Sequence, residues 1–315
     1  MSALFHIVKN TFRENLREPI FLLVTMAAVV LIGLFPTMTL FVFREQTKLV
    51  VDSSMATSLT FGWILAVIIA GHAVTREIET GTALLMLSKP VDRTIFILGK
   101  ILGILLSLAV FCFITSVATL ISVRIAKDQF RIDLGLLGIY FGALAVSCIS
   151  GGLRNFLTNK SFPMAAMVSM AVIFPLALIP SELAAESERF YWPLVPASIL
   201  VSYAVLTMGI LATSLSTRFN LVPNLALCAC VFIVGTMSDY LFGQYADTSI
   251  VANVLYALIP NWQLFWMADA LAVGKTIPWA YVAYGAIYII LFMGMFLGLA
   301  VLLFRNREVG IQNQV

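Results

Sequence analysis

The sequence predicts an all-α protein that crosses a membrane several times. Hydrophobic residues make up 61% of the 315 residues, charged residues only 11%, and the mean hydropathy is +1.00. Several uninterrupted apolar runs reach the ~20 residues that a helix needs to cross a bilayer. These runs are apolar on all sides, whereas strands of a transmembrane β-barrel alternate between apolar and polar residues. We therefore expect one polytopic helical membrane domain over residues 1–315.

Residues 1–18 have the pattern of an amphipathic helix that lies on a membrane surface. Apolar residues recur at helical spacing on one side and basic residues on the neighbouring side, namely Phe5, Val8, Phe12 and Leu16 against Lys9, Arg13 and Arg17. Such a helix buries its apolar side in the headgroup region while its basic side attracts an anionic leaflet. A merely solvated N-terminus is the alternative. The apolar run that follows is too long for a secretory signal, so we expect a retained first span.

Eight apolar segments are long enough to cross the bilayer: 20–43, 56–74, 94–126, 134–153, 162–179, 194–217, 221–242 and 279–304. A short polar loop, 44–55, precedes the second. The third makes about 50 Å of helix against an apolar core of ~30 Å, so it must tilt or project into water. The fourth and fifth are less apolar and form a re-entrant hairpin in an alternative topology with six spans. We expect eight.

The segment 243–278 is too polar and too interrupted to cross. Its tryptophans, Trp262 and Trp266, suit the headgroup level of a bilayer. We expect short interfacial or re-entrant helices here, on the outer side. Orientation follows from the basic residues, because 12 of the 19 fall on one side: in the N-terminal helix, the segment around 75–93, the turns at Arg154/Lys160 and Arg218, and the C-terminus. The positive-inside rule places that side, with both termini, in the cytoplasm.

Catalytic and metal-binding motifs are not visible. The only Gly-Lys-Thr, at 274–276, has Asp269 where a Walker A sequence has its first glycine. All the cysteines lie in apolar runs, where they pack as small apolar residues: Cys112, Cys148, Cys228 and Cys230. Ionisable residues are scarce within the spans, which argues against an ion-coupled secondary transporter. That class, and a structural or assembly subunit of a membrane complex, remain as alternatives. We expect no catalytic residue and no metal site.

One short charged segment, 75–93, separates the second and third spans. It concentrates charge in a chain that has little: Arg76, Glu77, Glu79, Lys89, Asp92 and Arg93. Such a segment must lie in water, and Pro90 cannot continue a helix, so the chain turns back to the membrane near Arg93. In the simplest reading it is a solvated loop whose charges only set the topology.

The segment resembles the cytoplasmic coupling helix of ABC transporter permeases of the type-2 exporter group. The resemblance rests on Glu77-x-Glu79-x-Gly81-Thr82, then Leu84-Leu85, then the run 88–93 with Gly99-Lys100 opening the next span. Three weaker features follow in the same order as in the family: the amphipathic start, the segment 259–262 with Gly274 and 277–278 after it, and the basic C-terminal end at 304–308. Many of these permeases have six spans, so the extra pair departs from the pattern.

The resemblance implies a membrane subunit without catalysis of its own. Similar permeases pair as homo- or heterodimers, dock a separate cytoplasmic ATPase that binds ATP and Mg, and move a substrate mostly outward across the plasma membrane, the inner membrane of a bacterium. We expect no cofactor in this chain and no nucleic-acid partner. The resemblance assigns the ATPase-coupling role to Arg76, Glu77, Glu79, Thr80, Gly81, Thr82, Leu84, Pro90 and Arg93. It leaves lipids, peptides, drugs and polymers open as substrates.

Overall fold

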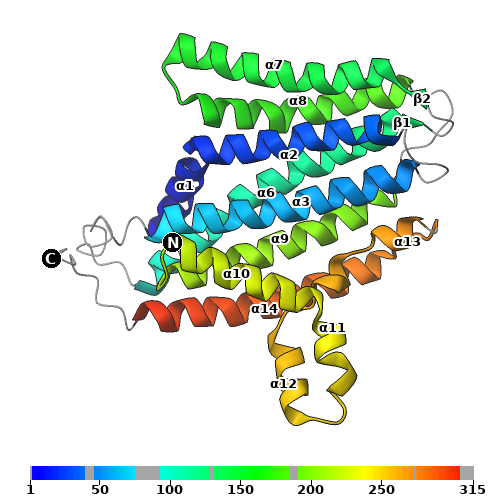
Figure 1. Ribbon diagram of the computed structural model, residues 1–315. Coiled ribbons are helices and arrows are strands. Elements are labelled where there is room, and N and C mark those ends of the chain that lie inside the picture. Colours follow the sequence, from blue (N-terminus) through cyan, green and yellow to red (C-terminus); the bar gives the residue numbers. More distant parts are fainter. Residues whose placement is uncertain are drawn as a thin grey trace.

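Long helices with roughly aligned axes dominate the computed structural model, which describes residues 2–39, 46–75, 93–127, 131–184, 191–272 and 274–305 (Figure 1). The longer helices are α1 (Ser2–Arg17), α2 (Pro19–Met38), α3 (Gln46–Ala70), α6 (Arg93–Ile125), α7 (Leu134–Thr158), α8 (Phe162–Ala184), α9 (Leu194–Ser216), α10 (Leu221–Thr236) and α14 (Trp279–Arg305). Two-residue strands β1 (Ala126–Lys127) and β2 (Arg131–Ile132) pair antiparallel at the α6–α7 turn. The prediction of an all-α polytopic membrane protein is confirmed.

Within the described residues, seven helices are long and apolar enough to cross a membrane: α2, α3 with its π-helical end η2 (Gly71–Thr75), α6, α7, α8, α9 and α14. α10 passes the same test only together with the short helices after it, from which it is bent by 69°. Both α7 and α8 are full-length helices lying antiparallel (Figure 1). Their lengths favour two crossings over a re-entrant hairpin.

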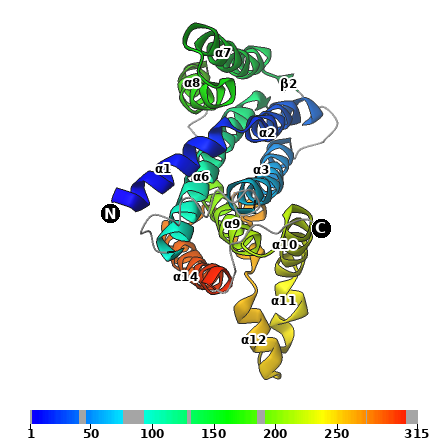
Figure 2. The same ribbon diagram turned by 90° about the vertical axis from the view of Figure 1, so that its left-hand side faces the viewer.

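The buried fraction of the helices decreases from the middle of the bundle to its two sides. α9 lies in the middle with 67% of its most apolar 18 residues buried, whereas α14 buries only 22%. Viewed along the bundle from the end where α1 lies, α7 and α8 are on one side and α11 (Ser238–Leu241) and α12 (Ile250–Leu258) on the other (Figure 2). The core therefore sits among α3, α6 and α9, and the two flanks present apolar side chains outward.

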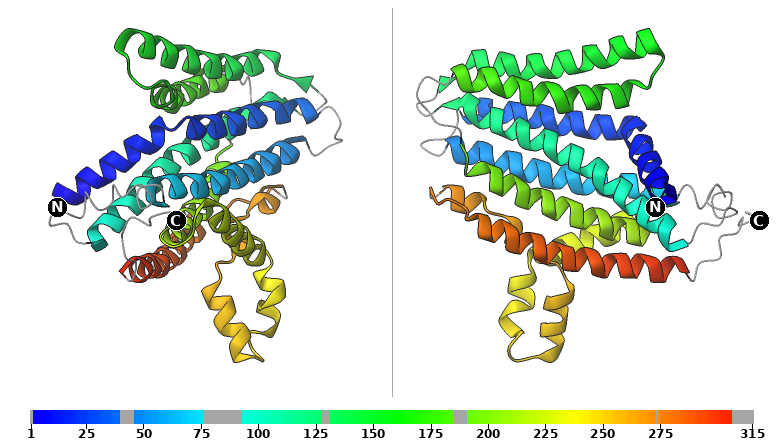
Figure 3. Two further views of the ribbon diagram at one scale, coloured as in Figure 1. Left: turned by 60° about the vertical axis from the view of Figure 1, so that its left-hand side comes forward. Right: turned by 180° about the vertical axis from the view of Figure 1, so that it is seen from behind.

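The basic segments gather at one end of the bundle, which we call the α1 end. α1, the α7–α8 turn, the start of α6 and the end of α14 lie there in every view (Figures 1 and 3). Arg218, in the α9–α10 turn, donates from Nε to the carbonyl oxygen of Leu303 near the end of α14 at 3.0 Å. The opposite end, called the α13 end, holds α13 (Ala268–Ala272) and the β1–β2 turn.

Two predicted boundaries differ from the structure. The residues expected as a polar loop before the second span are helical from Gln46, so that span is 28 residues long, to Ala73. At about 42 Å it exceeds the apolar core, so its polar first turns project beyond the membrane without ending the helix. The seventh predicted span, 221–242, stops at Thr236. Gly235 lies so close to the backbone of Pro260 and the ring of Trp262 that a Cβ there would meet both.

The predicted short helices in 243–278 are present. After α11 come the 3-10 turn η3 (Gly243–Tyr245) and α12, then the 3-10 turn η4 (Trp262–Phe265) and α13. Residues 238–258, which we call the arm, project away from the bundle, roughly across the direction of the long helices (Figures 1 and 2). The arm is apolar and open: Ile250 is 85% exposed and Val251 70%. Aromatic and aliphatic side chains exposed in this way need lipid or another chain as a partner.

Candidate functional site

The predicted coupling segment connects two helices that meet at the α1 end. The chain leaves η2 at Thr75 and returns at Arg93, the first residue of α6. The coupling residues Arg76, Glu77, Glu79, Thr80, Gly81, Thr82, Leu84 and Pro90 lie outside the described residues. The structure describes η2 before the segment, α6 after it, and α1, which packs against the first turns of α6.

α1 packs parallel to the first turns of α6 through small residues spaced four apart. A Cβ at Gly99 would lie 2.6 Å from the side chain of Ile7, and one at Gly103 2.6 Å from that of Thr11. One turn further on, Asn15 donates from Nδ2 to Oγ of Ser107 at 3.1 Å. The two helices thus meet once per turn over three turns, as small-residue interfaces between membrane helices allow. We call this interface the α1–α6 joint.

A buried lysine adds charge to the joint. Lys100 of α6 is only 1% exposed, and its Nζ lies 4.0 Å from a carboxylate oxygen of Glu14 on α1. The same ammonium lies 5.9 Å from the ring centroid of Phe96. A buried charge is costly without a partner, so the pair favours the arrangement in which α1 stays on α6. The sequence placed Lys100 at the opening of the third span and counted it with the basic residues of the cytoplasmic side.

The residues predicted to face the membrane surface divide between two sides of α1. Lys9, Arg13 and Arg17 are exposed, as is Phe5 at 63%, while Val8 and Phe12 are half-buried. The face that packs on α6 is centred on Thr11 and Asn15, which are both buried. The expected apolar stripe therefore faces partly outward, where Lys9 lies 5.9 Å from the ring centroid of Phe5. The amphipathic helix exists, and its buried face combines the polar Thr11 and Asn15 with the apolar Leu16, which is 2% exposed.

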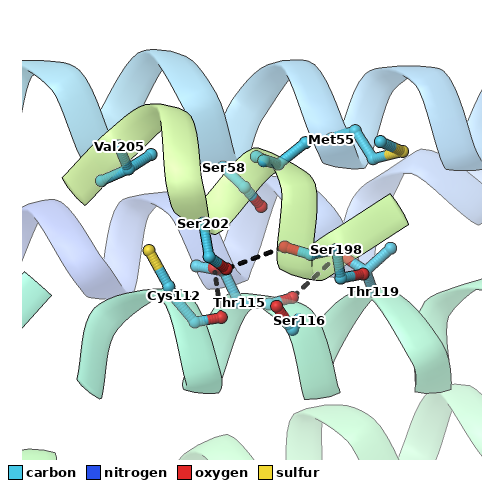
Figure 4. A pocket seen from close by; sticks show the side chains of 10 residues that line it. Met55, Ser58, Cys112, Thr115, Ser116, Thr119, Ser198, Ser202 and Val205 are labelled. Carbon is cyan, nitrogen blue, oxygen red and sulfur yellow. Dashed lines mark hydrogen bonds between the residues drawn. The ribbon is translucent and has the colours of Figure 1, made fainter. Parts of the chain in front are cut away.

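Hydroxyl groups line a small void in the middle of the bundle, between α3, α6 and α9 (Figure 4). Its volume is about 10 Å³, which is room for about one water. The polar lining is Ser58, Thr115, Ser116, Thr119, Ser198 and Ser202. Ser58, Thr115 and Ser202 each donate to a carbonyl oxygen four residues earlier, so their oxygen lone pairs remain for a guest. This void is closed to anything larger than water.

A larger cavity, about 570 Å³, lies between α3, α10, η4 and α13. Aromatic rings and short polar side chains share its wall, and we call it the aromatic cavity: Ala56, Leu59, Thr60, Phe232, Thr236, Trp262, Gln263, Trp266 and Asp269. Phe232 stacks on Trp63 of α3 at 5.8 Å between ring centroids and lies 6.4 Å from Trp262. Such a wall suits an amphiphilic guest, because apolar faces and hydrogen-bonding groups alternate around it.

A hydrogen-bond network holds the wall of the aromatic cavity in place. Asn261 is buried, and its Nδ2 donates to Oδ1 of Asp239 at 2.8 Å while its Oδ1 accepts from the backbone N–H of Gln263 at 3.0 Å. The hydroxyl of Tyr256 donates to the same Asp239 oxygen at 2.7 Å, and that of Tyr288 accepts from the backbone N–H of Asn261 at 2.9 Å. The network joins the arm to α14 at the bend after α10.

Sequence reasoning missed both the α1–α6 joint and this network. The signal for the joint was available as the spacing Gly99, Gly103, Ser107 in α6, which matches Ile7, Thr11, Asn15 in α1. For the network, no local signal pairs Asp239 with Asn261, because 22 residues separate them.

Comparisons with known proteins agree with this arrangement. A family model described as ABC-2 family transporter protein matches residues 5–245, from α1 into η3. Part of the chain is also similar to the probable ABC transporter permease protein NosY of Pseudomonas aeruginosa, with 29% identity over 127 residues. The matched residues are 37% of this chain and 46% of that relative, so the chain spans less than half the length of the curated relative.

Proposed function

The chain belongs to the ABC-2 family of transporter proteins, and from this premise we propose that it is the membrane-spanning permease subunit of an exporter driven by a separate cytoplasmic ATPase. The ATPase partner docks on the segment 75–93 and on α1, and it binds the ATP and Mg. The permease has no ATPase of its own. It sits in the plasma membrane of a bacterium with both termini in the cytoplasm, where the positive-inside rule places the α1 end.

The α1–α6 joint is the observation that carries this proposal. α6 begins where the coupling segment ends, and α1 is fixed to α6 by close backbone approach, a hydrogen bond and an ion pair between the buried Lys100 and the exposed Glu14. A push on the coupling segment therefore reaches α6 and α1 as one unit. α6 also lies in the core, so its movement shifts the packing of α3 and α9.

The proposals of export and of a dimer rest on the aromatic cavity, α10 and the arm. The aromatic cavity lies toward the α13 end, away from the proposed ATPase, where an outward route would release substrate. α10 buries only Asn224, Cys228 and Gly235, and it exposes apolar side chains such as Val222 and Ile233. A second permease copy or a paralogue covers this surface and the arm in the proposed dimer.

Charge reversal in the coupling segment tests the proposal. Glu77→Lys should leave membrane insertion intact, because no span changes, and should remove the ATPase that co-purifies with the tagged permease from native membranes. Loss of one partner from a buried charge pair at an interface costs about 2–5 kcal/mol, or roughly 1.5 to 3.5 decades in affinity. Lys275→Glu is the matched control, since Lys275 is an exposed charge just after α13, at the opposite end of the bundle from the α1 end.

Two results would contradict the proposal. If the Glu77→Lys protein retains its ATPase and transports as before, the segment 75–93 is a topological loop. If the unaltered protein purifies from native membranes with no ATP-hydrolysing partner, the chain acts as an ion-coupled transporter or as a structural subunit of a membrane complex.

A further inference from the structure

A basic cavity of about 600 Å³ lies where α1, α7 and α8 meet at the α1 end, a junction that Figure 3 shows from two sides. Its charged lining consists of Arg13 and Arg17 from α1, Arg154 from the last turn of α7, and Lys160 from the α7–α8 turn. Among the described residues, no acidic side chain belongs to the lining. Within the part of the chain that the structure describes, none of these cations forms a salt bridge.

The nearby acidic residues are engaged elsewhere. The Glu14 carboxylate lies 4.0 Å from the ammonium of Lys100, inside the α1–α6 joint. Glu18 is half-buried beside Pro19 and has an interaction partner of its own. Four cations that share one cavity repel one another, so an anion between them lowers the electrostatic free energy of the assembled helices.

The turn that carries Lys160 is held in a defined shape. Asn159 ends α7 in the left-handed conformation, with φ of 50°, and its backbone N–H donates to the carbonyl oxygen of Asn155 at 2.9 Å. The side chain of Asn155 in turn donates to the carbonyl oxygen of Lys160. Ser161 then precedes α8, and its carbonyl oxygen accepts the N–H of Ala165. The N-terminus of α8, a 23-residue helix, therefore faces the cavity and adds partial positive charge to that of the cations.

The wall of the basic cavity that α8 supplies is apolar and leads away from the charges. Met164, Ala165 and Val168 form this wall. Exposed apolar side chains continue at helical spacing along the same helix with Val172 and Leu176, 54% and 56% exposed. A compact basic site thus lies above an apolar stripe on a helix long enough to cross a membrane. A free phosphate ion has no use for the stripe, whereas an acyl chain does.

We propose that the basic cavity binds the phosphate group of an anionic membrane lipid, whose acyl chain lies along α8. The bound lipid ties the α7–α8 hairpin to α1 at the α1 end. The cavity shares Arg13 and Arg17 with α1, so its test uses Arg154 and Lys160, which lie in the α7–α8 hairpin and outside both proposed ATPase contacts, the segment 75–93 and α1. Its test can therefore fail while the proposed function stands, and the reverse is also true.

Native mass spectrometry of the purified full-length chain tests the proposal. Added phosphatidylglycerol should bind with one tightly retained lipid per chain, in preference to phosphatidylcholine. The double variant Arg154→Gln/Lys160→Gln should bind phosphatidylglycerol about 25-fold more weakly, the product of two charges that each contribute about five-fold near an anionic headgroup. Lys275→Gln is the matched control: it removes an exposed cation just after α13, away from the cavity lining, and binding should not change.

Conservative variants keep the test decisive. Lys160→Arg should bind phosphatidylglycerol as the unaltered protein does. If the double variant fails to fold, Lys160→Gln alone replaces it in the test, and its affinity for phosphatidylglycerol should be about five-fold lower. Equal retention of the two lipids, or undiminished phosphatidylglycerol binding in the variants, would overturn the proposal. Displacement of the lipid by inorganic phosphate at a concentration equal to that of the lipid would also overturn the proposal, because the site would then hold a free anion.

Discussion

The α1–α6 joint and the aromatic cavity are built on opposite principles. At the joint, glycines bring two helices into backbone contact, and what remains between them is filled by Thr11, Asn15 and the buried side chain of Lys100. Around the aromatic cavity, α3 and α10 are held apart by large rings, and about 570 Å³ stays open. Under the proposed function, the joint transmits movement and the cavity has room for it.

This difference places the fixed and the changing parts of the transporter. Close-packed interfaces shift as units and do not deform gradually, so a displacement at the α1 end should be carried whole into α6. The wall of the aromatic cavity depends instead on a few hydrogen bonds at the bend after α10. Breaking either region should therefore have a distinct effect.

The largest effect is expected at Gly103. In Gly103→Leu the new side chain would meet the side chain of Thr11 and the carbonyl oxygen of Val8, so α1 has to leave α6. Overpacking of this kind costs about 1–3 kcal/mol and often more when backbone is in the way. Trypsin should then cleave at Lys9, Arg13 and Arg17 in α1 at least ten times faster, as read by mass spectrometry.

Gly138→Leu is the control for this change, because a Cβ at Gly138 in α7 has nothing within 4 Å. An α1 that remains resistant to trypsin in the Gly103→Leu protein would show that the joint is not a tight contact.

An intermediate effect is expected at Asn261. Asn261→Ala removes the donor to Asp239 and the acceptor for the backbone N–H of Gln263, so two part-buried hydrogen bonds are lost at a buried side chain. The expected cost is about 2 kcal/mol of unfolding free energy, with looser packing of η4 against α10. Tryptophan fluorescence should report the change, since Trp262 lies next in the chain.

Asn253→Ala is the comparison for Asn261→Ala, because Asn253 is exposed on α12. Equal stability of the two variants would mean that the network does not hold the cavity wall.

The smallest effect is expected at Asn15. Asn15→Ala loses one hydrogen bond to Ser107 but leaves the glycine contacts intact, so the joint should weaken by about 1 kcal/mol and hold. Thermal unfolding in detergent should show a small decrease relative to Asn10→Ala, whose side chain is exposed on the same helix. A decrease as large as that of Gly103→Leu would indicate that polar contacts, and not close packing, hold α1.

Features of the fold that depend on neighbouring residues could be predicted from the sequence, and features that depend on distant residues could not. Hydropathy over about 20 residues is a local property, so the helices and the shared end of the basic segments could be predicted. The start of the second span was placed too late because Lys48 and Asp52 look like loop residues unless the helix is known to project. The partner of Asp239 could not be predicted, because it depends on how the chain returns after the arm. The spacing of Gly99, Gly103 and Ser107 in α6 is a local signal that predicts a close helix contact such as the α1–α6 joint.

The most direct test of the central claim is a pair of spin-label distances measured with and without ATP in the assembled transporter. Labels at Asn10 and Leu102, both exposed, report on the α1–α6 joint, and labels at Thr60 and Gln263 report across the aromatic cavity. The joint distance should stay the same in both states while the cavity distance changes. A joint that opens with ATP while the cavity stays constant would contradict the account.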